Sequence, residues 1–148
     1  MRHLIILLLV LAACKNGKRQ HFELKPLRPN VQEFKSGINR NRIDYFYVKG
    51  KFTYEKLNYA LLEKKVKTKF NSAVVQDYDL YSLYIYRDAD LSQKKHDGAV
   101  NTFDGQNEKL VAYIRYKQGK MDIFYIIKNG KVVFDLISGN EEYFEFDE

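Results

Sequence analysis

Acidic and hydroxyl side chains in one long connection of the chain have a spacing that suits a calcium ion. Asp88, Asp90 and Ser92 occupy alternate positions, as the first three oxygen ligands of a calcium-binding loop do. Such a loop also needs a glycine directly after the third ligand and a bidentate glutamate at its end. Gln93 and Ala99 occupy those two positions here. We therefore predict no metal site.

The same connection, residues 87–109, holds the residue types of a hydrolytic site. Its candidates are Asp88, Asp90, His96, Asp97 and Asp104. A histidine oriented by a carboxylate can act as a general base, and a loop much longer than about 4 to 6 residues is commonly functional. Sequence neighbours such as His96 and Asp97 rarely adopt the geometry of a catalytic triad, so we favour a solvated acidic loop. The alternative is a hydrolase that uses His96 and the acids of the 88–108 loop.

Strong catalytic signatures are absent from the sequence. It contains no Gly-x-Ser-x-Gly, no His-Glu-x-x-His and no phosphate-binding glycine loop. Outside the N-terminal segment the histidines are His21 and His96. We therefore expect no cofactor, and we favour a non-enzymatic function.

Tyrosine is the other distinctive residue type, since the chain has 12 Tyr and no Trp. A tyrosine ring can be buried while its hydroxyl stays in water, so an exposed patch would suit a protein or glycan partner. The lack of tryptophan argues against a glycan partner, because binding sites often stack sugars on tryptophan rings. Cross-strand packing is the structural alternative, and we favour it. The candidate binding surface combines tyrosines with residues of the long loop: Tyr84, Tyr86, Tyr113, Tyr116, Asp88, Asp90 and His96.

The single cysteine, Cys14, closes a segment with the layout of a secretory signal peptide. A basic start precedes the apolar run 4–11, and the small pair Ala12-Ala13 follows it. The run is about 8 residues long, whereas a helix that crosses a bilayer needs roughly 20 apolar residues. We therefore predict that residues 1–13 are removed after export.

The end of this segment, Leu11-Ala12-Ala13-Cys14, resembles the lipobox of bacterial lipoproteins. The resemblance implies that Cys14 becomes the mature N-terminus and carries a thioether-linked diacylglycerol. Two or more acyl chains hold a protein stably on a membrane, since each buried CH₂ contributes about 0.8 kcal/mol. Lys15 stands where an aspartate retains enterobacterial lipoproteins in the inner membrane. If the cell has two membranes, the resemblance therefore favours the outer one.

The formal charge of +6 is divided unevenly along the chain. Residues 14–71 hold 15 Lys/Arg against 5 Asp/Glu, and residues 72–148 hold 9 against 14. A basic first half could contact anionic lipid head groups. Because no run of Lys and Arg exceeds two residues, we favour an ordinary solvated surface. The expected partners are the membrane, through the lipid, and an envelope protein; the exported location argues against nucleic acid.

Three segments are predicted along the chain: the signal peptide 1–13, a lipidated tether 14–42 and one domain 43–148. The tether is rich in glycine, proline and asparagine and shows no clear apolar period. Its apolar residues are enough to dock parts of it on the domain: Phe22, Leu24, Leu27, Val31 and Phe34. With one cysteine, no disulfide can form within the chain, so the domain must rely on its apolar core.

The domain is predicted to begin with a strand at 43–48, followed by a helix at 54–70 with Thr53 as its N-cap. Leu57 and Leu61 form one apolar stripe of this helix. The second stripe consists of Tyr59, Leu62, Val66 and Phe70. We expect one stripe to pack on a sheet and the other under neighbouring chain.

Regular alternation predicts a strand at 78–86, with Tyr81, Leu83 and Ile85 on one face. Three further strands are predicted at 110–116, 121–127 and 132–137, and an edge strand at 141–148. Gln118-Gly119 and Asn129-Gly130 suit the tight turns of an antiparallel meander.

The expected fold is therefore α+β, with one main helix on an antiparallel sheet of about four or five strands that ends in a β-meander. The design is similar to that of small outer-membrane lipoproteins, including accessory subunits of the β-barrel assembly machinery. This is an analogy of fold alone. We expect a membrane-anchored binding or accessory module, with an envelope hydrolase as the alternative.

Overall fold

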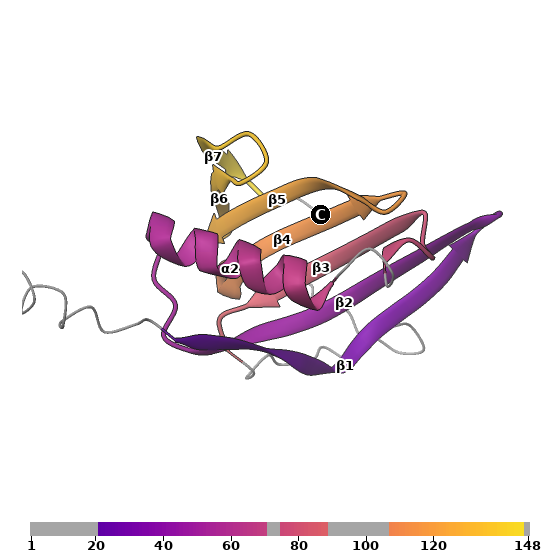
Figure 1. Ribbon diagram of the computed structural model, residues 1–148, viewed down its shortest axis with the longest axis horizontal. Helices are drawn as coiled ribbons and strands as arrows, with labels where there is room; N and C mark the ends of the chain where they lie inside the picture. The colour runs from indigo at the N-terminus through magenta and orange to yellow at the C-terminus, as the bar shows by residue number, and fades with distance from the viewer. Residues whose placement is uncertain (1–20, 71–74, 89–106, 147–148) are drawn as a thin grey trace, which may run out of the picture.

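The computed structural model describes residues 21–70, 75–88 and 107–146. They form one seven-stranded sheet whose strand order follows the chain, with one α-helix laid across it (Figure 1). The elements are β1 (Phe22–Ser36), β2 (Asn39–Gly50), α2 (Lys56–Lys69), β3 (Leu80–Tyr86), the 3₁₀ turn η1 (Asn107–Lys109), β4 (Leu110–Lys117), β5 (Lys120–Lys128), β6 (Lys131–Asp135) and β7 (Asn140–Glu145).

The sheet is antiparallel except between β2 and β3, which run parallel. A parallel neighbour requires a crossover connection, and α2 supplies it by returning the chain to the end of the sheet where β2 begins. The α+β class is thus confirmed. The expectation of a purely antiparallel sheet with four or five strands is wrong, because it missed β1 and the parallel pair.

Strand β1 lies in the segment that the sequence assigns to a tether. It pairs with β2 from Phe22↔Gly50 to Ser36↔Asn39, and the register shifts between Pro26 and Val31. Proline lacks the N–H that a ladder needs, and it is tolerated here because β1 is an edge strand with an irregularity at that point. The tether prediction is therefore wrong for the residues of β1 and the start of β2, whereas residues 1–20 lie outside the described part of the chain.

Helix α2 begins two residues later than an N-cap at Thr53 would place it. Its N-cap is Glu55, whose side chain makes no capping hydrogen bond. Asn58 Nδ2 instead donates to Thr53 Oγ1 (2.6 Å) and to the Thr53 carbonyl (2.9 Å). The predicted cap at Thr53 is wrong, because this side chain accepts from a side-chain amide rather than from the backbone of the first turn.

One of the two predicted helix stripes packs on the sheet as expected. Its members are all buried: Tyr59, Leu62, Val66 and Phe70. Leu57, from the other stripe, is 72% exposed, and Leu61 is only partly buried. The helix therefore has one packed face. In the described part of the chain, no segment covers the side of the helix that carries Leu57.

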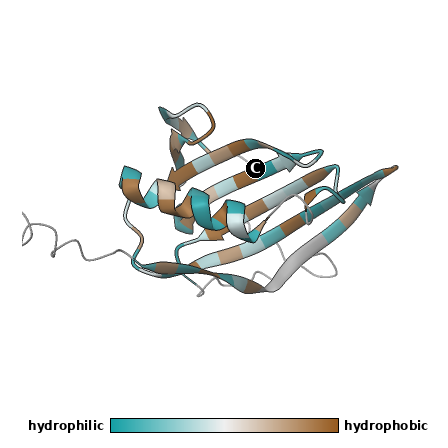
Figure 2. Cartoon of the chain, in the orientation of Figure 1, coloured by the Kyte–Doolittle hydropathy of each residue, from teal (hydrophilic) through white to brown (hydrophobic). Residues whose placement is uncertain are grey.

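The main core lies between α2 and the sheet. Figure 2 shows apolar residues recurring along the strands beneath the helix. Tyr81, Leu83 and Ile85 of β3 are fully buried there, as their alternation predicted. A second, smaller cluster occupies the opposite face: Leu27, Tyr45, Tyr86, Leu110, Ile127, Val132 and Phe146. In the described residues no helix lies over that second face.

The C-terminal meander is confirmed. Gln118-Gly119 and Asn129-Gly130 all have positive φ, between 50° and 77°, which is the conformation that a two-residue type I′ hairpin needs. The final predicted strand is present as β7, at the edge of the sheet beyond β6. These turns fix the register of β4, β5 and β6, and so decide which side chains share a face.

Candidate functional site

A row of four tyrosines crosses the sheet on the face opposite α2. The register pairs Tyr45 with Tyr84, Tyr84 with Tyr113, and Tyr113 with Tyr125. Directly paired residues lie on the same face of a sheet, and strands are about 4.8 Å apart, so the row spans roughly 14 Å over β2 to β5. We call this row, together with Phe144 and Phe146, the tyrosine face.

Contacts between rings hold the tyrosine face together. The centroids of Tyr45 and Tyr84 are 5.5 Å apart in a stacked arrangement, and those of Tyr84 and Tyr113 are 4.9 Å apart. The end of the chain extends the surface, since Phe146 lies 5.2 Å from Tyr113 and Phe144 lies 5.5 Å from Tyr125. Such pairs contribute roughly 0.5–1.5 kcal/mol each beyond their buried area. The rings therefore form a pre-ordered aromatic surface.

This surface is hollowed and partly accessible. A depression of about 400 Å³ lies between β3, β4, β5 and β7, and Tyr84, Tyr113, Tyr125 and Phe144 are among its walls. The three tyrosines are half-buried, and Phe144 is 42% exposed. A mainly aromatic hollow of this size lies within the range of pockets that accept an apolar group.

One guanidinium stands at the rim of the hollow. Arg115 forms a bidentate pair with Asp122, with Nε–Oδ1 at 3.1 Å and Nη2–Oδ2 at 2.8 Å. The hydrogen bonds that Arg115 donates to Asp122 raise the pKa of Arg115, so its charge is fixed at any ordinary pH. Burial raises the pKa of Tyr125, which keeps that hydroxyl neutral. The hollow thus combines rings with two charged side chains that are both paired, Arg115 with Asp122 and Glu145 with Lys131 (2.9 Å).

The structure brings together some of the predicted site residues and separates others. Tyr84 and Tyr113 lie side by side on the tyrosine face. Tyr86 points to the same side but is fully buried in the second cluster. Asp88 is exposed at the end of β3, with its Oδ1 4.0 Å from Lys109 Nζ. Asp90 and His96 lie outside the described residues, so the calcium and hydrolase hypotheses are untested.

Tyr116 does not belong to this surface. It is 5% exposed and lies in the core beneath α2, because residues three apart on a strand face opposite sides. Burial raises its pKa to about 12. Its hydroxyl is buried and has no hydrogen-bond partner in the described structure. The inclusion of Tyr116 in a binding surface is therefore wrong.

Sequence reasoning did not assign Tyr45, Arg115, Phe144 or Phe146 to this site. Arg115 and Tyr113 share a face by alternation, which the sequence does show. Tyr45 joins the row only through the parallel register of β2 with β3, and no local pattern encodes that register. Phe144 and Phe146 alternate along the C-terminal segment, but their contacts depend on the pairing of β7 with β6.

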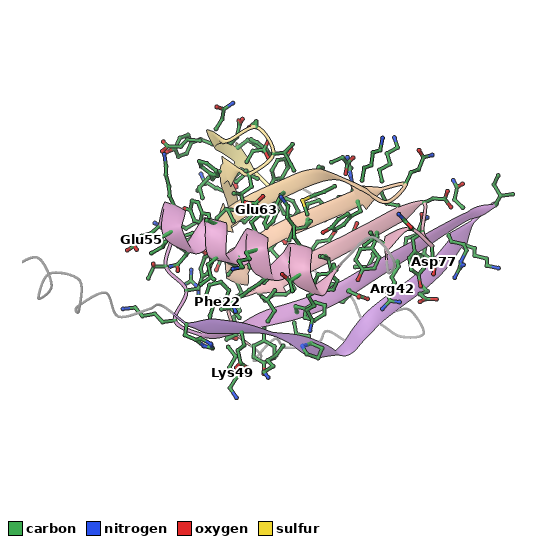
Figure 3. All side chains as sticks on the ribbon, viewed as in Figure 1. Phe22, Arg42, Lys49, Glu55, Glu63 and Asp77 are labelled. Carbon is green, nitrogen blue, oxygen red and sulfur yellow. The ribbon has the colours of Figure 1, made fainter. Side chains whose placement is uncertain are left out.

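A buried polar network lies on the other face of the sheet, toward the end where β2 begins (Figure 3). Asp44 is 4% exposed and accepts from Arg42 Nε (2.9 Å) and Nη2 (3.2 Å) and from the hydroxyl of Tyr81. Burial, together with the bond to Asp44, raises the pKa of Tyr81. Burial opposes ionisation of Arg42, but its hydrogen bonds with Asp44 and Tyr78 outweigh that effect and raise its pKa.

The network continues to β1. Arg42 Nη1 donates to Tyr78 Oη (3.1 Å) and to Glu33 Oε1 (3.2 Å), and Tyr78 donates to the same Glu33 oxygen (2.8 Å). The polar groups of the network are thus hydrogen-bonded to one another. The network joins β1, β2, β3 and the segment before β3. We interpret it as a structural cluster, because side chains that are hydrogen-bonded to one another around the buried Asp44 hold each other in place.

Within residues 21–70, 75–88 and 107–146, no group of three or more His, Cys, Asp or Glu side chains is arranged to hold a metal ion. The helices of that same part are too short or too polar to cross a membrane. Comparison with family models, curated proteins and solved structures gives no match.

Proposed function

We propose that this chain is a lipid-anchored protein of the bacterial cell envelope that binds a protein partner through its tyrosine face. The observation that carries the proposal is the row of partly exposed tyrosine rings on β3, β4 and β5, continued by Phe144. Tyr45, at the β2 end of the row, is buried and supports Tyr84 from the side. Tyrosine, phenylalanine and arginine are enriched in protein interfaces, and aromatic anchors supply much of the binding energy there. The function is that of a binding or accessory module rather than an enzyme.

The position of β1 supports an anchored arrangement. Cys14 precedes Phe22, the first residue of β1, by only eight residues. Even a fully extended chain of that length reaches about 28 Å. A lipid on Cys14 would therefore hold the sheet close to the bilayer, with a much shorter spacer than the 14–42 tether. In a cell with two membranes, we propose the outer one.

The preferred occupant of the hollow is an apolar side chain of an envelope protein. The surrounding rings offer apolar contact, and their hydroxyls can exchange hydrogen bonds at the rim. Arg115 is already satisfied by Asp122, so it contributes a planar wall rather than an unpaired charge. A partner that inserts a large apolar residue would thus leave no buried charge without a counterion.

Two adjacent residues of β7 provide a matched test. Phe144 packs on Tyr125 in the tyrosine face, whereas Tyr143 is 77% exposed and lies at a separate hollow beside Lys56 and Tyr59. The anchored chain would carry a photoreactive phenylalanine analogue at position 144 or, as the control, at position 143. We expect one defined envelope protein to cross-link from 144 and not from 143.

A pair of substitutions that each introduce a negative charge completes the test. In this experiment the photoreactive analogue replaces Tyr125, and we expect it to cross-link to the same envelope protein. Phe144→Glu should abolish this cross-link, whereas Tyr143→Glu should leave it intact. Equal products from both positions, or no effect of Phe144→Glu, would contradict the tyrosine face as the binding surface.

A further inference from the structure

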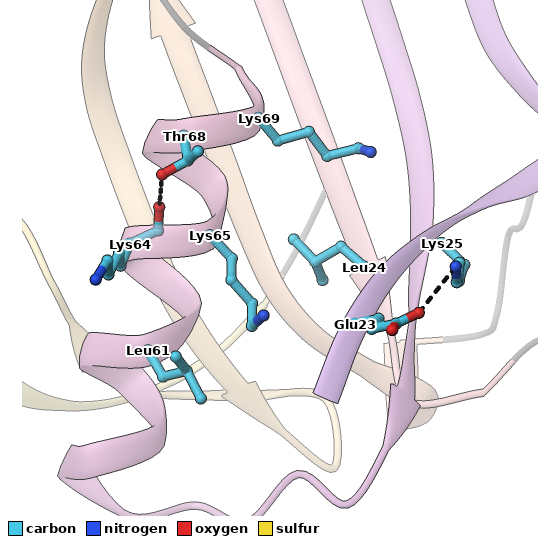
Figure 4. A pocket seen from close by; sticks show the side chains of 8 residues that line it. All are labelled: Glu23, Leu24, Lys25, Leu61, Lys64, Lys65, Thr68 and Lys69. Atoms are coloured by element: carbon cyan, nitrogen blue, oxygen red, sulfur yellow. Dashed lines mark hydrogen bonds and ion pairs between the residues drawn. The ribbon is translucent and has the colours of Figure 1, made fainter. Parts of the chain in front are cut away.

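A groove of about 590 Å³ lies between α2 and β1, on the opposite side of the sheet from the tyrosine face (Figure 4). Leu24 of β1 and Leu61 of α2 supply its apolar lining. Lysines surround them: Lys25, Lys64, Lys65 and Lys69. We call this feature the lysine groove.

The carboxylate groups that line the lysine groove do not balance its positive charge. Glu23 is the acidic residue that lines it, and Lys25 already holds that carboxylate at 2.8 Å. No described carboxylate lies within ion-pair distance of Lys65 or Lys69. Lys67 shows the contrast, because on the same helix its Nζ is 2.6 Å from Glu63. The groove therefore has charge complementarity to an anion.

Two of the lysines are held in position by aromatic rings. Lys65 Nζ is 5.5 Å from the centroid of Phe22, and Lys69 Nζ is 5.3 Å from that of Phe46. Contacts of this kind orient an ammonium without removing its charge. Figure 4 shows both side chains extending from α2 toward the β1 side of the groove. Each ammonium group thus lies at its own ring, and together they make one wall of the groove positively charged.

The groove also lies where an anchored domain would meet the membrane. Its β1 wall is formed by Glu23 to Lys25, immediately after the residue at which the sheet begins. With a lipid on Cys14, this wall would be within about 30 Å of the head groups even for a fully extended spacer. This reach is longer than the Debye length of roughly 10 Å, so the anchor keeps the groove near the membrane and electrostatic attraction acts when the lysines approach the head groups.

We infer that the lysine groove binds the phosphate head group of an anionic phospholipid of the membrane to which the chain is anchored. This inference rests on the proposed lipid anchor. Lys65 and Lys69 supply the positive charge that attracts the phosphate, and Leu24 and Leu61 contact the glycerol and the first methylenes of the acyl chains. The α2–β1 side then lies on the membrane, and the tyrosine face, across the sheet, is directed away from it toward a partner.

The experiment compares lysine accessibility on two kinds of vesicle. The full chain, purified with its lipid, is reconstituted on phosphatidylcholine vesicles or on vesicles that also contain phosphatidylglycerol. An amine-reactive reagent then labels exposed lysines, and mass spectrometry reports the rate at each position. We expect Lys65 and Lys69 to react severalfold more slowly on the anionic vesicles, and high salt to remove the difference.

Lys117 and Lys120, in the β4–β5 hairpin and outside the groove, are the internal controls. Their rates should not depend on the lipid. If Lys65 and Lys69 react equally fast on both kinds of vesicle, the phospholipid assignment is wrong, and an acidic protein surface becomes the better occupant.

The same sample separates this inference from the proposed anchor, because the intact mass reports whether Cys14 carries a lipid. If it does not, the anchor is wrong, and flotation of the unlipidated chain tests the groove directly. Flotation should then require phosphatidylglycerol and fall roughly fivefold for each lysine removed in Lys65→Gln/Lys69→Gln. Lys117→Gln/Lys120→Gln should float like the parent chain. Flotation that is independent of phosphatidylglycerol would overturn the inference.

Discussion

Tyr81 and Tyr116 are paired directly across β3 and β4, with ring centroids 6.1 Å apart, yet their hydroxyls have opposite environments. The hydroxyl of Tyr81 donates to the buried carboxylate of Asp44, whereas that of Tyr116 is buried without a partner. The same substitution should therefore lower the free energy of unfolding at Tyr81 and should not lower it at Tyr116.

Tyr81→Phe should lower the free energy of unfolding by about 1.5–3 kcal/mol, because it removes a hydrogen bond to a buried charged group. Arg42 would still hold Asp44, so the variant should fold. Urea denaturation followed by circular dichroism measures the change. Stability equal to that of the parent chain would show that the Tyr81 hydroxyl does not support Asp44.

Tyr116→Phe should leave the free energy of unfolding unchanged or raise it by about 1 kcal/mol, because no hydrogen bond is lost and an unpaired polar group leaves the core. The same urea titration compares it with Tyr81→Phe, and the two variants serve as controls for each other. A loss larger than that of Tyr81→Phe would mean that the Tyr116 hydroxyl has a partner after all.

Alkaline pH should destabilise the parent chain partly through Tyr116. Burial raises the pKa of Tyr116 to about 12 in the folded state, so the folded state favours the protonated phenol. The stabilisation is present in full below about pH 10, the pKa of an exposed tyrosine, and is lost as pH rises toward 12. Unfolding curves from pH 8 to 11.5 should therefore show a shallower decline for Tyr116→Phe than for the parent. Parallel curves would contradict the assignment.

Membrane attachment should depend on Cys14. Cys14→Ser removes the only thiol of the chain and should abolish labelling with a radioactive fatty acid. The protein should also leave the salt-washed membrane fraction, because an apolar run of about 8 residues is too short to anchor it as a spanning helix. Retained label together with retained membrane association would refute the lipid anchor.

The first strand offers a test of where the domain begins. Phe22 is fully buried beside α2, whereas Phe34, on the same strand, is 47% exposed. Phe22→Ala should reduce the free energy of unfolding by about 3–5 kcal/mol, the usual cost of removing a buried ring. Phe34→Ala is the matched control and should cost far less. Similar small losses at both positions would favour the tether predicted from the sequence.

The contrast between β3 and β1 shows what local sequence can predict. In β3, Tyr81, Leu83 and Ile85 alternate without interruption, and this alternation alone identified the strand and its buried face. In β1, Phe22 and Leu24 begin the same alternation, but Pro26 interrupts it, so the segment resembles a spacer. The strand forms because β2 offers a full edge to pair with, and this is a tertiary effect.

The candidate site also contains some residues that local sequence predicts and others that it does not. Tyr84 and Tyr113 were predicted, since each lies in a clear strand. The parallel register that brings Tyr45 beside Tyr84 depends on where α2 returns the chain, and this cannot be read from either strand alone. Tyr116 was misassigned because its residue type was considered without its position in the alternation of β4.

The two edges of the described sheet have a further consequence if the chain is held on a membrane, as we propose. Copies confined to one plane meet at a much higher effective concentration than copies free in solution, and exposed strand edges would let them join into a continuous sheet. β1 opposes such joining because Pro26 lacks a donor and its register is broken. β7 opposes it through Glu141, Glu142 and Glu145, whose charges repel another such edge. Both edges therefore carry features that oppose pairing with a second copy of the same edge, and the faces of the sheet are available without such pairing.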